Sequence, residues 1–223
     1  MTHLGPYPID SIITGDAREL AQAIPDESVD LIFTDPPYLR EFLGLYGDIA
    51  EIGARVLKPG GWLFAYGAGE HLPDHLARMG MHLDYFWVFI LKHQNGWPRM
   101  WNKKLMSAYK PIMVYTKGKP RTQHWLATMH GDSKDKDWHD WGQGDGFALK
   151  IIDLLTEPDD VVVDFCAGGG TTPAVCKMLR RHYLAFEIDP DTAERARQRV
   201  LTTQAPLVFP EYEQLPLDTA HQS

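Results

Sequence analysis

The sequence predicts an α/β fold, in which a mostly parallel β-sheet carries helices on both of its faces. The first observation is that strand-like apolar segments alternate with helix-like amphipathic segments along most of the 223 residues. The second is that segments such as VDLIFTD (29–35) and VVVDFCA (161–167) are apolar almost throughout, which is typical of strands covered on both faces. Alternating strands and helices imply right-handed crossovers, which place successive strands parallel in one sheet.

Local signals delimit the individual elements in chain order. Pro25 stops a short amphipathic helix at 17–24, and KPGG (58–61) is a turn. Thr172 and Pro173 would supply the N-cap and the first-turn proline of a helix. The complete prediction has strands at 9–16, 29–35, 62–68, 83–91, 111–116, 161–167 and 183–189, and helices at 17–24, 41–57, 70–79, 146–155, 173–181 and 191–200.

Two segments, 92–110 and 117–145, interrupt this alternation and are predicted to be inserted loops. We therefore expect one domain over residues 1–204, with an inserted basic and aromatic region at about 92–145. Residues 205–223 are rich in proline and acid and should form an irregular tail.

Composition favours a cytoplasmic protein without a membrane segment. Hydrophobic residues make up 44% and charged residues 23% of the chain, as in ordinary soluble proteins. No apolar run reaches the roughly 18 residues of a membrane span, and the N-terminus lacks the pattern of a secretory signal. The two cysteines, Cys166 and Cys176, are poorly placed to pair if the second lies on a helix, so we expect reduced thiols.

The charge is distributed unevenly. The formal net charge of -8 argues against a nucleic-acid partner, yet residues 85–131 contain no acid and hold eight of the 22 basic residues. Aromatic rings are interleaved with these charges, and the combination suits phosphates and exposed bases. The alternative is a solvated basic face with some rings in the core. The predicted DNA contacts are Lys92, Trp97, Arg99, Trp101, Lys103, Lys104, Lys117, Lys119 and Arg121.

A glycine-rich turn follows the predicted strand at 161–167. Ala167 and three glycines separate Asp164 from the next helix, and small residues there let a ligand approach the main chain. Glu187 comes 23 residues after Asp164, at the end of the next predicted strand, where an acid can accept hydrogen bonds from ribose hydroxyls. A tight turn with a surface acid would be the simpler explanation of either feature alone. Together they indicate a nucleoside cofactor.

Two motifs resemble those of the DNA amino-methyltransferases. DFCAGGGTT (164–172) is similar to their AdoMet-binding motif, and DPPY (35–38) to their catalytic motif. Because the catalytic motif comes first, the order resembles that of the beta class, which methylates N6 of adenine or N4 of cytosine. The resemblance continues in TGDA (14–17), VLKPGGWLFAYG (56–67) and FEIDPDTAERARQRV (186–200). It implies a Rossmann-like AdoMet-dependent methyltransferase fold with permuted motif order.

The resemblance also implies AdoMet as cofactor and a set of residues that bind it. This sequence departs from the family in two places: WGQGDGFALK (141–150) replaces a common TQKP, leaving Gln143 as the matching polar residue, and DFC replaces DPF, which puts Phe165 against the cofactor. Asp16 could contact the adenine end of AdoMet or simply cap the helix at 17–24. The complete cofactor set is Asp16, Asp35, Gln143, Asp164, Phe165, Cys166, Ala167, Gly168, Gly170, Thr171, Thr172, Glu187 and Ile188.

The DPPY motif carries the predicted catalytic residues. An exocyclic amine is a poor nucleophile, and two acceptors for its N–H groups would orient it and build electron density on nitrogen. Asp35 supplies a carboxylate and Pro36 a carbonyl, whose direction the Pro36–Pro37 pair restricts, while Tyr38 offers a face for an extruded base. Without the cofactor motif, a strand-capping turn with Tyr38 in the core would be the better explanation.

An aspartate at the first motif position is typical of adenine-modifying members, whereas N4-cytosine members usually carry serine. The sequence therefore predicts N6-adenine methylation of DNA by base flipping. N4-cytosine methylation and a catalytically silent DNA-binding module remain alternatives. A homodimer and a cognate restriction endonuclease are left open as partners. No metal site is predicted, because His71 and His75 have Pro73 between them and no third ligand.

Overall fold

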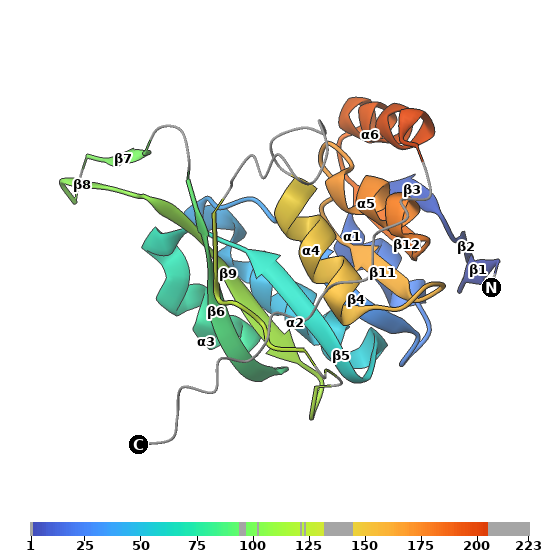
Figure 1. Cartoon of the computed structure of the whole chain (residues 1–223), viewed down its shortest axis with the longest axis horizontal. Coiled ribbons are helices and arrows are strands. Elements are labelled where there is room, and N and C mark those ends of the chain that lie inside the picture. The colour runs from blue at the N-terminus through green and yellow to red at the C-terminus, as the bar shows by residue number, and fades with distance from the viewer. Residues whose placement is uncertain are drawn as a thin grey trace, which may run out of the picture.

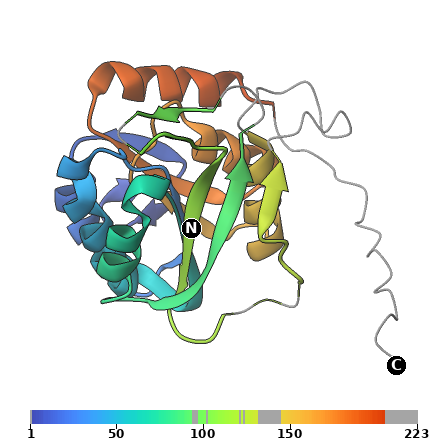
Figure 2. The same ribbon diagram turned by 90° about the vertical axis from the view of Figure 1, so that its left-hand side faces the viewer.

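The computed structural model describes residues 2–93, 97–101, 103–120, 122, 124–131 and 145–204. The predicted tail at 205–223 lies outside these residues. The described chain forms an eight-stranded sheet with helices on both faces (Figures 1 and 2). None of its helices is long and apolar enough to cross a membrane.

Eight strands form the main sheet in the order β10-β6-β9-β5-β4-β11-β12-β3. Among them only β9 runs antiparallel to its neighbours. The carboxyl ends of the seven parallel strands and the amino end of β9 therefore meet at one edge of the sheet, called here the carboxyl edge. The strands are β3 (Ser11–Thr14), β4 (Val29–Thr34), β5 (Leu57–Tyr66), β6 (Asp84–Lys92), β9 (Tyr109–Thr116), β10 (Met129–Gly131), β11 (Val161–Asp164) and β12 (His182–Glu187).

Two layers of helices bury the two faces. Along β4, Leu31 and Phe33 belong to one core cluster and Val29 and Ile32 to the other, because successive side chains of a strand point to opposite faces. Helices α1 (Ala17–Leu20), α2 (Leu43–Val56) and α3 (Leu72–Met79) contribute to one cluster, and α4 (Asp145–Leu155), α5 (Thr171–Leu179) and α6 (Pro190–Thr202) to the other. Short 3-10 helices η1 (Ala21–Ala23), η2 (Arg40–Phe42) and η3 (Gly69–His71) complete the connections. The predicted α/β fold is confirmed.

Two predicted loops contain strands. Within 92–110, β7 (Arg99–Met100) and β8 (Leu105–Met106) form a small antiparallel hairpin that projects from the body of the molecule (Figure 1). Within 117–145, β10 adds a parallel strand to the edge of the sheet beside β6. The prediction of loops is wrong at these residues, because strands of two or three residues carry no readable periodicity. A second small hairpin, β1 (His3–Leu4) with β2 (Tyr7–Pro8), lies at the N-terminus.

Two local predictions also need correction. KPGG does not precede β5 but lies within it. Val29 of β4 pairs with Leu57, and Leu31, two residues on, pairs with Trp62, so β5 has three more residues than β4 over this interval. The segment therefore forms an irregular bulge rather than a separate turn. Helix α5 begins at Thr171 after Gly170, whose φ is 79°, so Thr172 is not its N-cap. The Thr172 hydroxyl instead lies 3.4 Å from the Phe33 carbonyl, buried between strand and helix.

Candidate active site

The DPPY segment follows β4 at the carboxyl edge. The prolines end the pairing of the strand, because neither can donate a main-chain hydrogen bond. The Asp35 side chain is 48% exposed and accepts a hydrogen bond on Oδ1 from the Tyr38 hydroxyl. Burial and the neighbouring Asp35 carboxylate raise the pKa of Tyr38 well above its ordinary value, so this hydroxyl remains a donor. Asp35 and Tyr38 thus lie together at the end of the strand, and their catalytic roles stay predictions.

The Pro36 carbonyl is approached by a tyrosine that the sequence did not single out. Tyr46 on α2 is fully buried, and its hydroxyl donates to the Tyr66 carbonyl at 3.0 Å and lies 3.5 Å from the Pro36 carbonyl. The ring of His75 packs on Tyr46 with centroids 3.8 Å apart. Burial lowers the pKa of His75 to about 4, so this histidine is neutral core rather than a titrating group. The described residues hold no cluster of three metal-ligating side chains.

Lys110 is a second residue that sequence reasoning did not place at the site. Its ammonium lies 3.5 Å from Asp35 Oδ2, 5.0 Å from the centre of the Tyr38 ring and 5.1 Å from that of Tyr66. The antiparallel direction of β9 brings Lys110, its second residue, to the carboxyl edge. Knowledge of that direction would have identified the residue, but a strand's direction within a sheet cannot be deduced from its own apolar pattern.

The glycine turn starts from a buried acid. Asp164, the last residue of β11, is nearly inaccessible and accepts a hydrogen bond of 3.0 Å from the Cys166 N–H. Burial raises the pKa of Asp164 to about 6, although the hydrogen bond from the Cys166 N–H opposes the increase. This carboxylate organises the turn from within the protein.

Gly168 and Glu187 make the surface that a nucleoside would contact. The Glu187 carboxylate accepts the Gly168 N–H at 2.8 Å and the Asp189 N–H at 3.0 Å, so its direction is set by the main chain. Gly168 has a φ of 49°, and among the described residues a Cβ added there would meet only the Cys166 carbonyl, at 3.9 Å. An oriented acid beside a position with free space fits a ribose and the adjoining part of a nucleoside cofactor. Ile188, 68% exposed, offers an apolar surface next to them.

Three residues of the predicted cofactor set take part in packing between elements, and the contacts of Gly170 and Thr171 with the cofactor stay predictions. A Cβ on Gly170 would lie 3.0 Å from the Ala196 Cβ and 3.2 Å from its carbonyl oxygen, so this glycine permits α6 to approach. Phe165 is 3% exposed and stacks on Phe186 in the core beneath α1–α3, so the prediction that its side chain faces the cofactor is wrong. The Thr171 hydroxyl accepts a hydrogen bond of 3.1 Å from Arg199.

The remaining cofactor residues surround the turn. Asp16 caps α1 by accepting the Arg18 N–H at 2.9 Å, and the Arg18 side chain lowers the pKa of its carboxyl. Ala167 is buried, and burial raises the pKa of the half-buried Cys166 thiol well above its ordinary value. Gln143 lies outside the described residues. The cap role of Asp16 is confirmed, and its contact with adenine stays a prediction.

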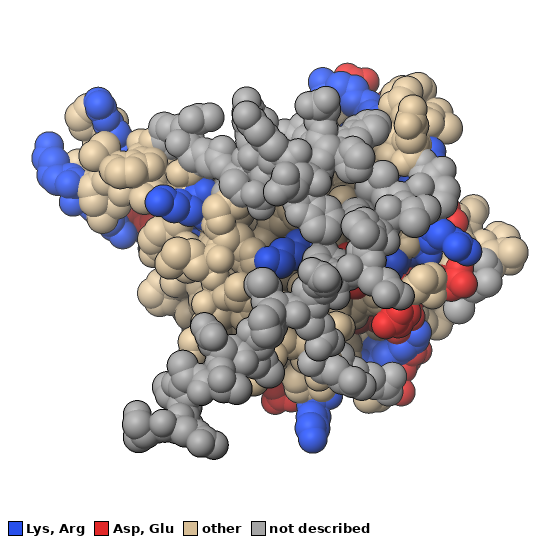
Figure 3. Space-filling view, viewed as in Figure 1, with Lys and Arg blue, Asp and Glu red and all other residues tan. Residues whose placement is uncertain are grey.

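The β7–β8 hairpin places four of the nine predicted DNA contacts, Arg99, Trp101, Lys103 and Lys104, at the carboxyl edge. Trp101 is 70% exposed, and the Arg99 guanidinium lies 5.7 Å from the centre of its ring. Lys103 Nζ is 3.6 Å from Glu70 Oε1, in η3 after β5. The space-filling view shows basic side chains along this projection (Figure 3). Lys92, Trp97 and Lys104 are exposed in the same region of the chain, and Arg121 lies outside the described residues.

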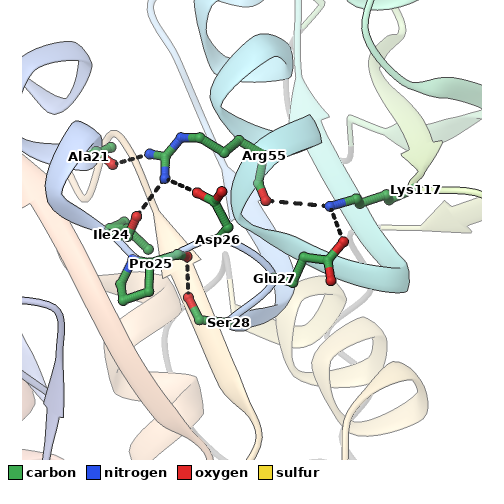
Figure 4. Close-up of polar contacts among 8 residues, drawn as sticks. All are labelled: Ala21, Ile24, Pro25, Asp26, Glu27, Ser28, Arg55 and Lys117. Carbon is green, nitrogen blue, oxygen red and sulfur yellow. Dashed lines mark hydrogen bonds and ion pairs between the residues drawn. The ribbon is translucent and has the colours of Figure 1, made fainter.

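Lys117 and Lys119 are not with the others. Both follow β9, whose end pairs with the start of β5 and β6, so they lie at the opposite edge of the sheet from Asp35. Lys117 Nζ lies 3.1 Å from Glu27 Oε1 and 3.4 Å from the Arg55 carbonyl (Figure 4). The sequence grouped these lysines with the hairpin, and the structure separates them.

Comparison with known proteins agrees with this geometry. A family model described as DNA methylase, of the N6/N4 type, matches residues 29–198. The type II methyltransferase M.BglII of Bacillus subtilis is 27% identical over 85% of this chain and 68% of its own length. M.HinfI of Haemophilus influenzae is 25% identical over 86% of this chain and 68% of its own length. M.BamHI of Bacillus amyloliquefaciens is 26% identical, with 81% of this chain matching 55% of that protein.

Solved structures share the fold. The cytosine-N4-specific PvuII DNA methyltransferase superposes with a TM-score of 0.72 at 20% identity, over 85% of both chains. M1.HpyAVI, solved as a complex with SAM, gives a TM-score of 0.66 at 20% identity over 85% of this chain and 98% of that one. The family is AdoMet-dependent. With the catalytic motif on β4 preceding the glycine turn after β11, the chain belongs to the beta class of the N6/N4 DNA methylase family.

Proposed function

We propose that this protein transfers the methyl group of AdoMet to the N6 amine of adenine in DNA. The observation that carries the proposal is the pair of acceptors at the end of β4, the Asp35 carboxylate and the Pro36 carbonyl. They lie at the same edge of the sheet as Gly168, in the turn after β11, and Glu187, at the end of β12. Two acceptors beside a nucleoside site suit the orientation of an amine toward a methyl donor.

The residues of the chain would prepare the base for attack. The amine lone pair of adenine is delocalised into its ring, so hydrogen bonds from the amine to Asp35 and Pro36 would hold nitrogen in position and increase its electron density. Tyr46 would keep the Pro36 carbonyl in place through its contact of 3.5 Å. Tyr38 would stack on the base, which must leave the duplex to reach Asp35. AdoMet, when bound, supplies a methyl group activated by its sulfonium.

The cofactor would bind across the turn after β11. Glu187 would accept hydrogen bonds from the ribose hydroxyls, and Gly168 would leave room for the nucleoside. Ile188, exposed beside Glu187, would pack on the adenine ring, with Asp16 near its polar edge. Asp164 would act indirectly, by fixing the turn through the Cys166 N–H.

DNA would meet the carboxyl edge through the β7–β8 hairpin. Arg99, Lys103 and Lys104 are exposed there with Trp101, and Lys92 and Trp97 lie nearby in the chain. Positive charge would contact phosphates, and the rings would stack on exposed bases. Lys117 and Lys119 have no place in this contact, because they lie at the opposite edge. A homodimer and a cognate restriction endonuclease stay predictions.

N4-cytosine methylation is the second candidate. The fold shared with the cytosine-N4-specific PvuII enzyme favours it, whereas the aspartate at position 35, by the family pattern, favours adenine. The deciding experiment incubates unmethylated DNA with the protein and AdoMet carrying a labelled methyl group, then hydrolyses the DNA and identifies the labelled nucleoside by mass spectrometry. Labelled N6-methyl-2′-deoxyadenosine supports the proposal, and labelled N4-methyl-2′-deoxycytidine supports the second candidate. DNA binding without transfer would indicate a silent binding module.

A further inference from the structure

Lys110 engages the same groups that the target base needs. Both Asp35 oxygens are in use: Oδ1 accepts from the Tyr38 hydroxyl, and Oδ2 lies 3.5 Å from the Lys110 ammonium. The ammonium also lies near the faces of Tyr38 and Tyr66, at 5.0 and 5.1 Å from their ring centres. A flipped base would bring an N–H donor to the carboxylate and a flat ring to a tyrosine face. The Lys110 ammonium therefore makes both kinds of contact that the base would make, one with the Asp35 carboxylate and one with a tyrosine face.

Of the two groups on Asp35, Lys110 is the one that can leave. The Tyr38 ring packs against the core cluster, and its pKa is raised so far that the hydroxyl keeps its proton. Lys110 is held by its main chain, which pairs with Leu91 of β6. Its flexible four-carbon stem allows the ammonium to turn away while the main chain stays paired, and its side chain is 27% exposed.

The charge of Lys110 also conflicts with methyl transfer. The amine gains positive charge as it takes a methyl group from a sulfonium, and an ammonium beside Asp35 would oppose that gain. Resting on the proposed function, we propose that Lys110 is a placeholder for the target amino group. Its ammonium occupies the Asp35 and tyrosine contacts and is displaced when the base enters. Lys110 is thus a positioning residue that determines how readily a flipped base binds at Asp35.

Two substitutions at position 110 test the proposal in opposite directions. Lys110→Met keeps the length of the side chain and removes the charge, so a base would enter without displacing a cation. Lys110→Arg keeps the charge and can hold a carboxylate with two hydrogen bonds, so displacement becomes harder. The matched control is Lys150→Met, which removes one lysine from the exposed surface of α4.

The measurement is steady-state methylation of a duplex that carries the target site, mapped first with the unaltered protein. We expect KM for DNA to fall about 5-fold in Lys110→Met, because the substitution removes a partly exposed ion pair and two cation–π interactions, each weak at such exposure. KM should rise in Lys110→Arg. Lys150→Met should match the parent. The maximal rate per enzyme should change less than about 2-fold, because the lysine has left before the chemical step.

Other outcomes would overturn the placeholder. A higher KM in Lys110→Met, with a salt slope reduced by about 0.9, would make Lys110 a phosphate contact. A kcat reduced about 10-fold or more at unchanged KM would give it a role in the chemical step, and equal kinetics in all variants would give it none. Failure of the unaltered protein to methylate DNA would instead remove the proposed function. The two failures are therefore distinguishable.

Discussion

Two lysines at opposite ends of β9 show how differently one strand can use the same residue. Lys110, near its beginning, lies against Asp35 and two tyrosine rings at the carboxyl edge. Lys117, just after its end, contacts Glu27 and the Arg55 carbonyl at the opposite edge, where the parallel strands begin, called here the amino edge (Figure 4). Both belong to the segment without acids, and nothing in their immediate sequence separates them. The direction of β9 alone assigns one to the site and the other to the scaffold.

The two edges also differ in what their charges do for stability. At the amino edge the Arg55 guanidinium donates to the Ile24 carbonyl at 2.6 Å, the Ala21 carbonyl at 2.8 Å and Asp26 at 2.7 Å. These hydrogen bonds join α2 to the segment before β4 and satisfy main-chain acceptors. At the carboxyl edge Asp164 is buried at a cost that appears as its raised pKa. The charge of Arg55 therefore stabilises the fold at the amino edge. At the carboxyl edge the buried charge of Asp164 destabilises the fold, and the site is formed around it.

The largest expected effect of a single substitution is on catalysis at the carboxyl edge. Asp35→Ala removes one of the two acceptors for the target amine, and the loss of one such preorganised group typically costs about 10²- to 10³-fold in rate. Labelled-methyl transfer measures the rate, and calorimetry should show AdoMet affinity close to that of the parent. Asp26→Ala, which removes an acid at the amino edge, should leave the rate unchanged. A large loss of AdoMet affinity in Asp35→Ala would place Asp35 in the cofactor site instead.

The next effect is a pH-dependent change in stability at Asp164. Its pKa of about 6 in the folded protein exceeds the ordinary value of 3.8, so the folded state binds more protons between about pH 4 and 6. The contribution of this group to the free energy of unfolding therefore decreases as pH rises through that range, by up to about 3 kcal/mol. Asp164→Asn should remove this decrease, which urea unfolding at several pH values would detect.

Only the difference between Asp164→Asn and the parent isolates this group. His75 has the opposite sign, because its pKa is lowered from 6.5 to about 4 and the unfolded state binds more protons below pH 6.5. Its contribution to the free energy of unfolding is fully present above pH 6.5 and is lost as pH falls toward 4. Parallel stability curves for Asp164→Asn and the parent would show that Asp164 titrates normally in the fold.

A smaller effect is expected at the amino edge, where Arg55→Met should reduce stability without reducing the rate. The substitution leaves the Ile24 and Ala21 carbonyls without this donor, which should lower the free energy of unfolding by about 1–3 kcal/mol. Lys117→Met should cost at most about 1 kcal/mol, because its ion pair with Glu27 is partly exposed. Denaturant unfolding measures both. A reduced methylation rate in fully folded Arg55→Met would mean that the edges are coupled.

The smallest expected effect is on the salt dependence of DNA binding, which should differ between the hairpin lysines and the lysines at the amino edge. Replacing Lys103 and Lys104 with alanine should weaken binding to all sequences and flatten the plot of log affinity against log salt by about 0.9 for each phosphate that a lysine had neutralised. The matched double substitution of Lys117 and Lys119 with alanine removes the same charge at the other edge and should leave the slope unchanged. Equal slopes in the two double variants would contradict the assignment of DNA to the hairpin.

Much of the fold and part of the site could be predicted from local chemistry. Strands β4 and β11 are recognisable because they are apolar on both faces. The prolines after β4 and the glycines after β11 mark where each strand ends. Glu187 could be placed by its spacing, because the turn and the following helix have nearly standard lengths. The β7–β8 hairpin and β10 could not be predicted, since strands of two or three residues carry no readable periodicity. The pairing of β10 with β6 also joins residues that are distant in sequence.

The sequence by itself determined the alternation of strands and helices, the two motifs and their order, because each rests on the conformational limits of a few adjacent residues. Only the tertiary structure decided that Lys110 joins Asp35, that Tyr46 approaches Pro36, that Gly170 serves α6 and that Lys117 belongs to the scaffold. Each of these depends on the direction in which an element enters the sheet or the face that it buries. Those choices are made by the burial of apolar surface across the whole domain, and a local pattern carries no record of them.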